Sequence, residues 1–249
     1  MAKTKVLFVG ESWFITTIET KGFDQFTIGG YETEIQRVID ALGDDFEVTH
    51  MPAHEALNSF PETLEELQQY DVIMVSDVGA NTFLLNPKTF QRSLRTANRL
   101  DLIAEFVRQG GGFAMIGGYL TFMGIEGKGK YKGTVIEDIL PVELLPGDDR
   151  QEHPEGIMLH CDADKSELLR GMPAQSSYLL GYNKLIPKPQ AQVLIDYQGD
   201  PMLACWECGE GRVFTWASDC APHWMPVEFC ESDFNKTMWR NMTAWAAHK

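Results

Sequence analysis

Residues 110–119 read GGGFAMIGGY, and this stretch decides the fold. The four apolar residues at 113–116 lie between two groups of glycines, which is typical of a short buried strand. Apolar side chains three and four residues apart between positions 100 and 107 predict a helix that ends at the first glycines. A helix, a glycine turn and a buried strand in this order indicate an α/β fold with a parallel sheet.

The same alternation of strands and helices extends toward the N-terminus. Apolar runs predict further strands at residues 6–10, 46–49 and 71–77. Helices are expected at residues 31–42, where one stripe is apolar, and at 62–69. The first half is therefore expected to form a doubly wound, mostly parallel sheet of the flavodoxin-like type.

The C-terminal half has a different pattern, with extra β-hairpin elements. Residues 135–197 contain short β-like pieces separated by Pro and Gly, and residues 202–218 predict a hairpin that turns at 209–211. A last helix is expected from about residue 233, with its apolar face on the sheet. No repeat, low-complexity tract or linker interrupts the sequence, so residues 1–249 are expected to form one domain.

The charge balance excludes several classes of partner. The 249 residues hold 21 Lys and Arg against 36 Asp and Glu, which gives a net charge of -15. Such a surface repels phosphate backbones and anionic lipids, so neither nucleic acid nor a membrane is expected as a partner. No apolar run approaches the roughly 20 residues that span a bilayer. An odd number of cysteines favours free thiols in a reducing compartment, so the chain is expected in the cytoplasm.

Polar and aromatic residues follow the predicted strands at their carboxyl ends, where open parallel sheets bind ligands. Carboxylates, an imidazole, a phenol and an indole together suit a polar small molecule held between apolar walls. The candidate ligand-binding residues are Glu11, Ser12, Asp77, Asn81, Gly118, Tyr119 and Trp224, and the candidate catalytic residues are Asp219 and His223.

Several of these candidates also have a purely structural interpretation. Glu11 and Asp77 follow strands and could cap the helices that come next. Trp224 could be a packing residue. His223 follows Pro222 in an expected loop, and an imidazole is the side chain best suited to carry protons near neutral pH.

Three further patterns bear on metals, cofactors and loops. Cys205 and Cys208 have the spacing of a zinc ligand pair, but they lie in a predicted strand, where residues three apart point to opposite faces. Gly29 and Gly30 precede a predicted helix whose N-terminus could hold an anion, but no nucleotide motif accompanies them. The sequence therefore predicts no metal and no cofactor. The loop 124–130, rich in Gly and Lys, is interpreted as a flexible surface loop or as a lid over the pocket.

The stretch 110–119 resembles the strand and elbow of class I glutamine-amidotransferase-like domains, and residues 71–77 resemble the strand before it. Residues 164–173 and 209–214 resemble a turn and a hairpin of the trehalose-utilisation-like branch. The segments that follow the strands are similar to a bacterial subfamily of glutamine-amidotransferase-like and uncharacterised cytoplasmic proteins. The resemblance spans nearly the whole chain and rests on the order and spacing of its motifs.

The resemblance implies a cysteine nucleophile at the elbow, activated by a histidine after a late strand. The matching elbow position is Gly118, or Gly117 if the register shifts by one, and neither residue offers a thiol or a hydroxyl. His223 matches the late histidine, but the expected His-Pro-Glu pattern is absent. Cys220 lies three residues before His223, but the adjacent Asp219 would raise the pKa of its thiol. Cysteine-dependent glutaminase activity is therefore not expected.

The residues support two hypotheses for function. In the first, a degenerate amidotransferase-like domain binds a polar small molecule, and any chemistry is acid–base, with His223 as the proton carrier and Asp219 as its partner. The branch resemblance implies a carbohydrate-like ligand. In the second, the fold is a non-catalytic interaction or assembly module, since domains that resemble this one commonly form homo-oligomers. A deep polar pocket would favour the first hypothesis, and a plugged pocket beside a large apolar patch would favour the second.

Overall fold

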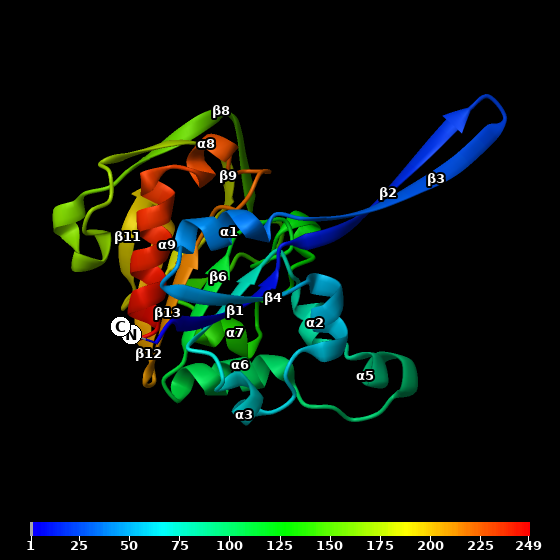
Figure 1. Ribbon diagram of the computed structural model, residues 1–249, viewed down its shortest axis with the longest axis horizontal. Coiled ribbons are helices and arrows are strands. Elements are labelled where there is room, and N and C mark those ends of the chain that lie inside the picture. Colours follow the sequence, from blue (N-terminus) through cyan, green and yellow to red (C-terminus); the bar gives the residue numbers. More distant parts are fainter. Residues whose placement is uncertain (1) are drawn as a thin grey trace.

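The computed structural model describes residues 2–249 and is built around a seven-stranded sheet (Figure 1). In order across the sheet, its strands are β11 (Gln192–Tyr197), β12 (Asp200–Cys208), β13 (Gly211–Trp216), β6 (Gly112–Ile116), β5 (Val72–Ser76), β1 (Thr4–Gly10) and β4 (Phe46–Met51). The strands from β13 to β4 pair in parallel, whereas β11 and β12 join the sheet through antiparallel pairings. The predicted mostly parallel α/β sheet is confirmed, and so is the hairpin predicted at residues 202–218.

The central strands are apolar on both faces because helices cover both faces. Every residue of β5 and β6 is buried, as continuous apolar runs in a parallel sheet should be. Figure 1 shows α1 (Ile35–Leu42) and α9 (Asp233–Ala246) together on one side of the sheet. The helices of the other group are α2 (Ala53–Ser59), α3 (Leu64–Leu67), α4 (Ala80–Leu84), α5 (Pro87–Arg92), α6 (Arg99–Arg108) and α7 (Val135–Ile139).

Side-chain caps set the start of several of these helices, among them α9 and α3. Ser232 accepts a hydrogen bond from the N–H of Asn235 and begins α9, which confirms the helix predicted from about residue 233. The helix predicted at residues 62–69 is shorter than expected. Thr63 forms a capping box, which places the start of α3 after it, and the helix ends within one turn. No helix among residues 2–249 is long and apolar enough to cross a membrane.

Short strands and turns make up most of the chain between β6 and the last hairpin. β8 (Arg150–His160) pairs with β9 (Gln175–Asn183), and β7 (Val142–Glu143) pairs with β10 (Ile186–Pro187). The short helical turns are η1 (Ile125–Gly127), η2 (Ala163–Lys165) and η3 (Glu167–Leu169), and α8 (Val227–Cys230) precedes α9. The β-rich pattern predicted for residues 135–197 is confirmed.

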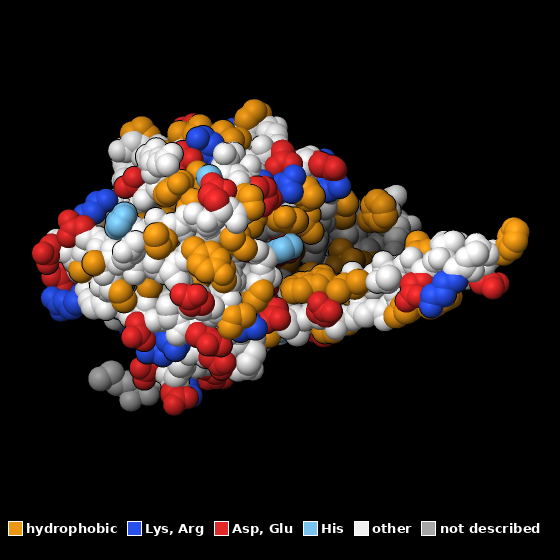
Figure 2. Space-filling model, turned by 90° about the horizontal axis from the view of Figure 1, so that it is seen from above, with side chains coloured by type: hydrophobic (Ala, Val, Ile, Leu, Met, Phe, Trp, Pro, Cys, Tyr) orange, Lys and Arg blue, Asp and Glu red, His pale blue; other side chains and the backbone are white. Residues whose placement is uncertain are grey.

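The largest departure from the sequence prediction is a long hairpin, which we call the arm. It consists of β2 (Ser12–Lys21) and β3 (Asp24–Thr33), which pair along their whole length. Figures 1 and 2 show the arm projecting far from the body of the molecule. The arm leaves the body directly after β1, so its base adjoins the carboxyl end of the sheet.

The arm corrects two sequence predictions. The helix predicted at residues 31–42 begins only at Ile35, because the preceding residues continue β3. Gly29 and Gly30 lie inside β3 and not at a helix N-terminus, so the anion site considered there does not exist.

Candidate functional site

The structure gathers most of the candidate residues at the carboxyl ends of the parallel strands. A pocket of about 430 Å³ opens there. Its lining residues are Glu11, Trp13, Asp77, Tyr119, Leu120, Ile125, Lys128, Asp219, Pro222 and His223. The pocket thus combines three carboxyl groups, an imidazole and a phenol with aromatic and aliphatic walls.

An uncommon backbone conformation places two of the carboxyl groups. Glu11 follows β1 with a φ of 49°, and Asp77 follows β5 with a φ of 52°. Non-glycine residues rarely adopt this left-handed region, and it costs on the order of 1 kcal/mol or more. The turn at each strand end directs both side chains to the pocket. Neither residue caps a helix, because the N-cap of α1 is Glu34 and the N-cap of α4 is Gly79.

Glu11 forms part of the buried floor of the pocket, with 3% of its surface exposed. Its Oε2 accepts hydrogen bonds from Ser76 Oγ at 3.0 Å and from Cys220 Sγ at 3.1 Å. Burial is the main reason that the pKa of Glu11 rises to about 7; the charge of Asp77 raises it further, and the two hydrogen bonds lower it. A carboxyl group with this pKa can donate or accept a proton near neutral pH.

Asp219 lies beside Glu11, in the segment that follows β13. Its Oδ1 accepts a hydrogen bond from the N–H of Cys220 at 2.7 Å. Burial raises the pKa of Asp219 well above its usual range, and the charges of Glu11 and Asp77 add to this effect. Two carboxyl groups this close do not both ionise readily, so the pair retains a proton near neutral pH.

His223 and Tyr119 form the rim of the pocket. Their rings stack with centroids 4.4 Å apart, and the His223 side chain is 53% exposed. His223 Nδ1 lies 4.0 Å from Asp219 Oδ2. The Tyr119 hydroxyl donates to Glu152 Oε1 at 3.3 Å, and the guanidinium of Arg150 lies 5.0 Å from the centre of the Tyr119 ring. His223 is therefore accessible to a ligand, held by Tyr119 and close to Asp219.

The elbow after β6 leaves no room for a nucleophile. A Cβ added at Gly118 would lie 2.9 Å from Asp77 Oδ1, and a Cβ added at Gly117 would lie 2.2 Å from the carbonyl oxygen of Ala217. Gly118 has a φ of 149°, a backbone conformation that other residues rarely adopt. The carboxylate of Asp77 thus lies beside the position where the resemblance implies a cysteine.

Backbone amides of the elbow are already hydrogen-bonded within the chain. The Leu120 N–H donates to Asp77 Oδ1 at 2.7 Å. The Gly118 N–H donates to Asn183 Oδ1 at 2.9 Å. In enzymes with such an elbow, amides of this kind stabilise the oxyanion of an acyl intermediate. Here Asp77 and Asn183 already accept hydrogen bonds from backbone N–H groups of the elbow.

Sequence reasoning missed the buried residues behind the elbow. Asn183 Nδ2 donates to the carbonyl oxygen of Gly118 at 3.2 Å and to Asp149 Oδ1 at 2.8 Å. The Asp149 carboxylate also accepts the N–H groups of Met123 and Gly124 at 2.9 and 2.8 Å. Asn183 and Gly118 are 65 residues apart in the chain, and no local motif links them.

Four sequence-predicted residues lie outside the pocket lining, and one of them is Gly118 at the elbow. Trp224 is buried, and its Nε1 donates to Glu152 Oε2 at 2.9 Å, so it packs behind the rim. Ser12 Oγ accepts a hydrogen bond from the N–H of Ala53 at 2.8 Å, which ties the base of the arm to α2. Asn81 is exposed on α4.

The loop 124–130 forms one wall of the pocket. Ile125 and Lys128 belong to the lining. The Gly129 N–H donates to the carbonyl oxygen of Met123 at 2.7 Å, which closes the loop on itself. The loop therefore lies against the pocket, and its backbone is held by hydrogen bonds.

One cluster offers ligand atoms for a metal ion. Among residues 2–249, Glu11, Asp219 and Cys220 place such atoms within 4.8 Å of one another, and all three are buried. Burial raises the pKa of the Cys220 thiol well above its usual value, so metal binding there requires the loss of a firmly held proton. Within the described chain, Cys205 and Cys208 belong to no such cluster, and burial raises the pKa of Cys205 to about 12.

Comparison with solved structures identifies close relatives of the whole fold. A cytoplasmic protein of Salmonella typhimurium is 41% identical with a TM-score of 0.92, and the match covers 97% of this chain and 98% of that chain. A second cytoplasmic protein, from Salmonella typhimurium LT2, is 43% identical with a TM-score of 0.92 and coverages of 98% and 99%. A thua-like protein of Parabacteroides merdae shares the fold at 10% identity and a TM-score of 0.59, with coverages of 99% and 90%.

The comparisons of sequence agree with the resemblance found in the motifs. No curated protein matches the chain. A family model described as "putative glutamine amidotransferase" matches residues 5–248. This match covers nearly the whole sequence, and the chain therefore belongs to that glutamine-amidotransferase-like family.

Proposed function

We propose that this chain binds a neutral, polyhydroxylated, carbohydrate-like molecule in the pocket and acts on it by proton transfer, without glutaminase activity. One observation carries the proposal: the carboxylate of Asp77 lies beside Gly118 and accepts a hydrogen bond from the amide of Leu120. A glutamine-derived acyl intermediate would have no nucleophile to form on, and the amides of Gly118 and Leu120 are already bonded within the chain.

The lining supports a neutral ligand with many hydroxyl groups. Carboxyl groups accept hydrogen bonds from hydroxyls, and the rings of Trp13 and Tyr119 offer flat apolar surfaces beside them. Lys128 already pairs with Glu126 at 2.7 Å, so it offers little attraction to an anion. A volume of about 430 Å³ suits one small molecule.

The ionisable groups support proton transfer as the chemistry. Glu11 has a pKa of about 7, so both of its protonation states are populated at neutral pH. Asp219 connects Glu11 to the imidazole of His223 at the rim. The floor of the pocket can therefore donate a proton to a ligand or accept one from it.

Titration calorimetry with neutral sugars, polyols, sugar acids and glutamine tests the proposal. A neutral polyol or sugar should bind, and at about 100 times its dissociation constant it should add about 2.7 kcal/mol to stability. His223→Ala should weaken binding or turnover, and Glu11→Gln should abolish turnover of a bound ligand. His160→Ala, at an exposed position on β8, is the matched control and should behave as the wild type.

Two results would refute the proposed function. One is release of ammonia from glutamine by the wild-type protein. The other is a panel in which no neutral polyol or sugar binds. We also propose that the chain acts in the cytoplasm, because the two Salmonella typhimurium relatives, 41% and 43% identical, are named as cytoplasmic proteins.

A further inference from the structure

The arm has no hydrophobic core of its own. Its two ten-residue strands pair from Ser12 with Thr33 to Lys21 with Asp24, and every residue of β3 is exposed. Figure 2 shows hydrophobic side chains along the arm and at its tip. An isolated two-stranded hairpin is marginally stable in water, so an arm of this length needs a surface to lie on.

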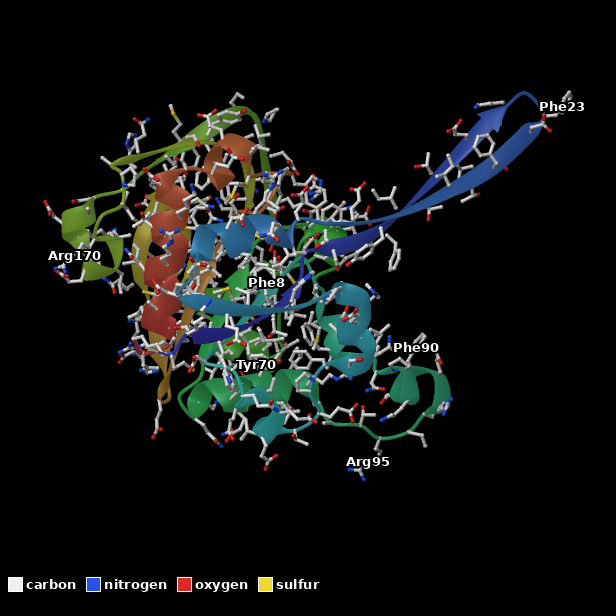
Figure 3. The ribbon with its side chains drawn as sticks, viewed as in Figure 1. Phe8, Phe23, Tyr70, Phe90, Arg95 and Arg170 are labelled. Carbon is white, nitrogen blue, oxygen red and sulfur yellow. The ribbon has the colours of Figure 1, made fainter. Side chains whose placement is uncertain are left out.

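Only the base of the arm finds such a surface within its own chain, among the residues that the structure describes. There the rings of Phe14, Tyr31 and His54 lie 5.1 to 5.3 Å apart and join the arm to α2. Farther out, the exposed apolar residues are Ile18, Phe23, Phe26 and Ile28. Figure 3 shows Phe23 at the tip, clear of the body. Phe26 and Ile28 lie on one face of the ribbon and Ile18 lies on the other, since Ile18 pairs with Thr27. The face of Phe26 and Ile28, with Phe23 at the tip, is an exposed apolar group of the kind that marks an interaction surface.

A second apolar surface lies at the same end of the molecule. We call residues 84–95 the α5 face. Its exposed apolar residues are Leu84, Leu85, Phe90 and Leu94. Figure 3 shows Phe90 at the edge of the body on the side from which the arm projects, and Arg95 at the lower edge of the body. The α5 face therefore has the same unpaired apolar character as the arm.

The charges of the two surfaces are opposite. The α5 face holds Lys88, Arg92 and Arg95 and no acidic residue, although the chain as a whole has a net charge of -15. The arm has one Lys against three acidic residues, which are Glu19, Asp24 and Glu32. An acidic, apolar arm and a basic, apolar face complement each other, and opposite charges guide such surfaces into register.

We propose that the arm of one chain docks on the α5 face of a second copy, forming a two-fold homodimer. The occupant is a second copy because both complementary surfaces belong to this chain, and a two-fold axis pairs each arm with the partner's face at once. The two strands of ten residues each match the roughly 20–30 residues that a stable interface uses on each side. The arm cannot cover the α5 face of its own chain, because the base of the arm packs on α2 and the tip of the arm points away from the body.

Sedimentation velocity of the full chain tests the dimer. The wild type should be a dimer at micromolar concentration. Phe23→Asp in the arm and Phe90→Asp in the α5 face should each raise the dimer dissociation constant by about 30-fold or more, the effect of losing a central apolar contact. Both positions are exposed, so the variants should melt as folded proteins. Met158→Asp, at a 53% exposed apolar residue on β8, is the matched control and should leave the dimer unchanged.

Charge reversal identifies the partner surface. Glu19→Arg with Asp24→Arg should weaken the dimer, and so should Arg92→Glu with Arg95→Glu. Combining all four substitutions should restore it, because the reversed arm then meets a reversed face. Arg170→Glu is the control, at an exposed residue that Figure 3 shows on the far side of the body.

Three results would overturn the proposal. A monomeric wild type would exclude the dimer. A dimer unaffected by the arm variants would exclude the arm as the contact. A dimer weakened by arm variants but not by face variants, or not restored by the four substitutions, would show that the arm lies on a different surface.

Discussion

At the scale of single residues, the contact between Asp77 and Gly118 limits the chemistry of the pocket. Gly118→Cys should destabilise the protein by about 1–3 kcal/mol without creating glutaminase activity, because the new side chain meets a carboxylate and adopts a rare φ. Thermal melting and ammonia release from glutamine measure the two effects. Gly147→Cys is the matched control, since no heavy atom lies within 4 Å of a Cβ added there. A fully stable Gly118→Cys variant, or one that releases ammonia, would contradict this account.

Glu11 makes stability depend on pH. Below pH 4.5 the folded and unfolded chains both hold its proton, whereas between 4.5 and about 7 only the folded chain does. The contribution of Glu11 to the free energy of unfolding therefore falls as the pH rises through that window, and it stays low above it. Glu11→Gln removes the penalty, so it should stabilise the protein by on the order of 1–3 kcal/mol at about pH 8 and by little at about pH 4.

Urea unfolding at the two pH values measures this effect. Glu65→Gln, at an exposed position on α3, serves as the control and should show no such difference. A Glu11→Gln variant that is equally destabilised at both pH values would show that folding does not raise the pKa of Glu11.

At the scale of elements, the end of β9 holds the elbow that follows β6. Asn183 is fully buried and bonds both the N–H and the carbonyl oxygen of Gly118. Asn183→Ala removes a hydrogen-bond partner from the N–H and the carbonyl oxygen of Gly118 and from Asp149. The free energy of unfolding in urea should therefore fall by about 2–4 kcal/mol. Asn58→Ala, whose exposed side chain bonds the carbonyl oxygen of His54, should change stability little. Equal losses in the two variants would argue against this role of Asn183.

The elements predicted correctly are those whose local pattern matches their final environment. β5 and β6 are continuous apolar runs, and both are buried on both faces. The arm was missed because its few apolar residues lie on both faces of the ribbon, so the two strands show no sustained alternation of the kind that marks a half-buried strand. The start of α1 was also missed, since Glu34 at its N-cap makes no side-chain capping bond that a sequence motif could reveal.

The candidate site could be predicted in part for a topological reason. Parallel strands bring their carboxyl ends to one edge, so the residues after β1, β5, β6 and β13 had to meet there. The roles of Asn183 and Asp149 could not be predicted, because their contacts with the elbow join positions 65 and 25 residues apart. The hydrogen bonding of Asp77 to the elbow likewise depends on the strained φ of Asp77, which no sequence pattern indicates.

At the scale of the whole molecule, charge and apolar surface are unevenly distributed. The body is acidic, but the α5 face is basic, and the arm carries its apolar side chains far from the core. The arm begins next to Glu11, and the α5 face follows Asp77 by way of α4. In the proposed dimer, each intersubunit contact therefore connects to a strand end that lines a pocket.

The pairing of Asp77 with Gly118 also constrains how such a chain can evolve. A Gly118→Cys step alone meets the carboxylate of Asp77, and loss of Asp77 alone leaves the amide of Leu120 without its acceptor. Each step by itself is expected to lower stability, and the cost of changing one position depends on the residue at the other. The two positions are thus expected to be epistatic.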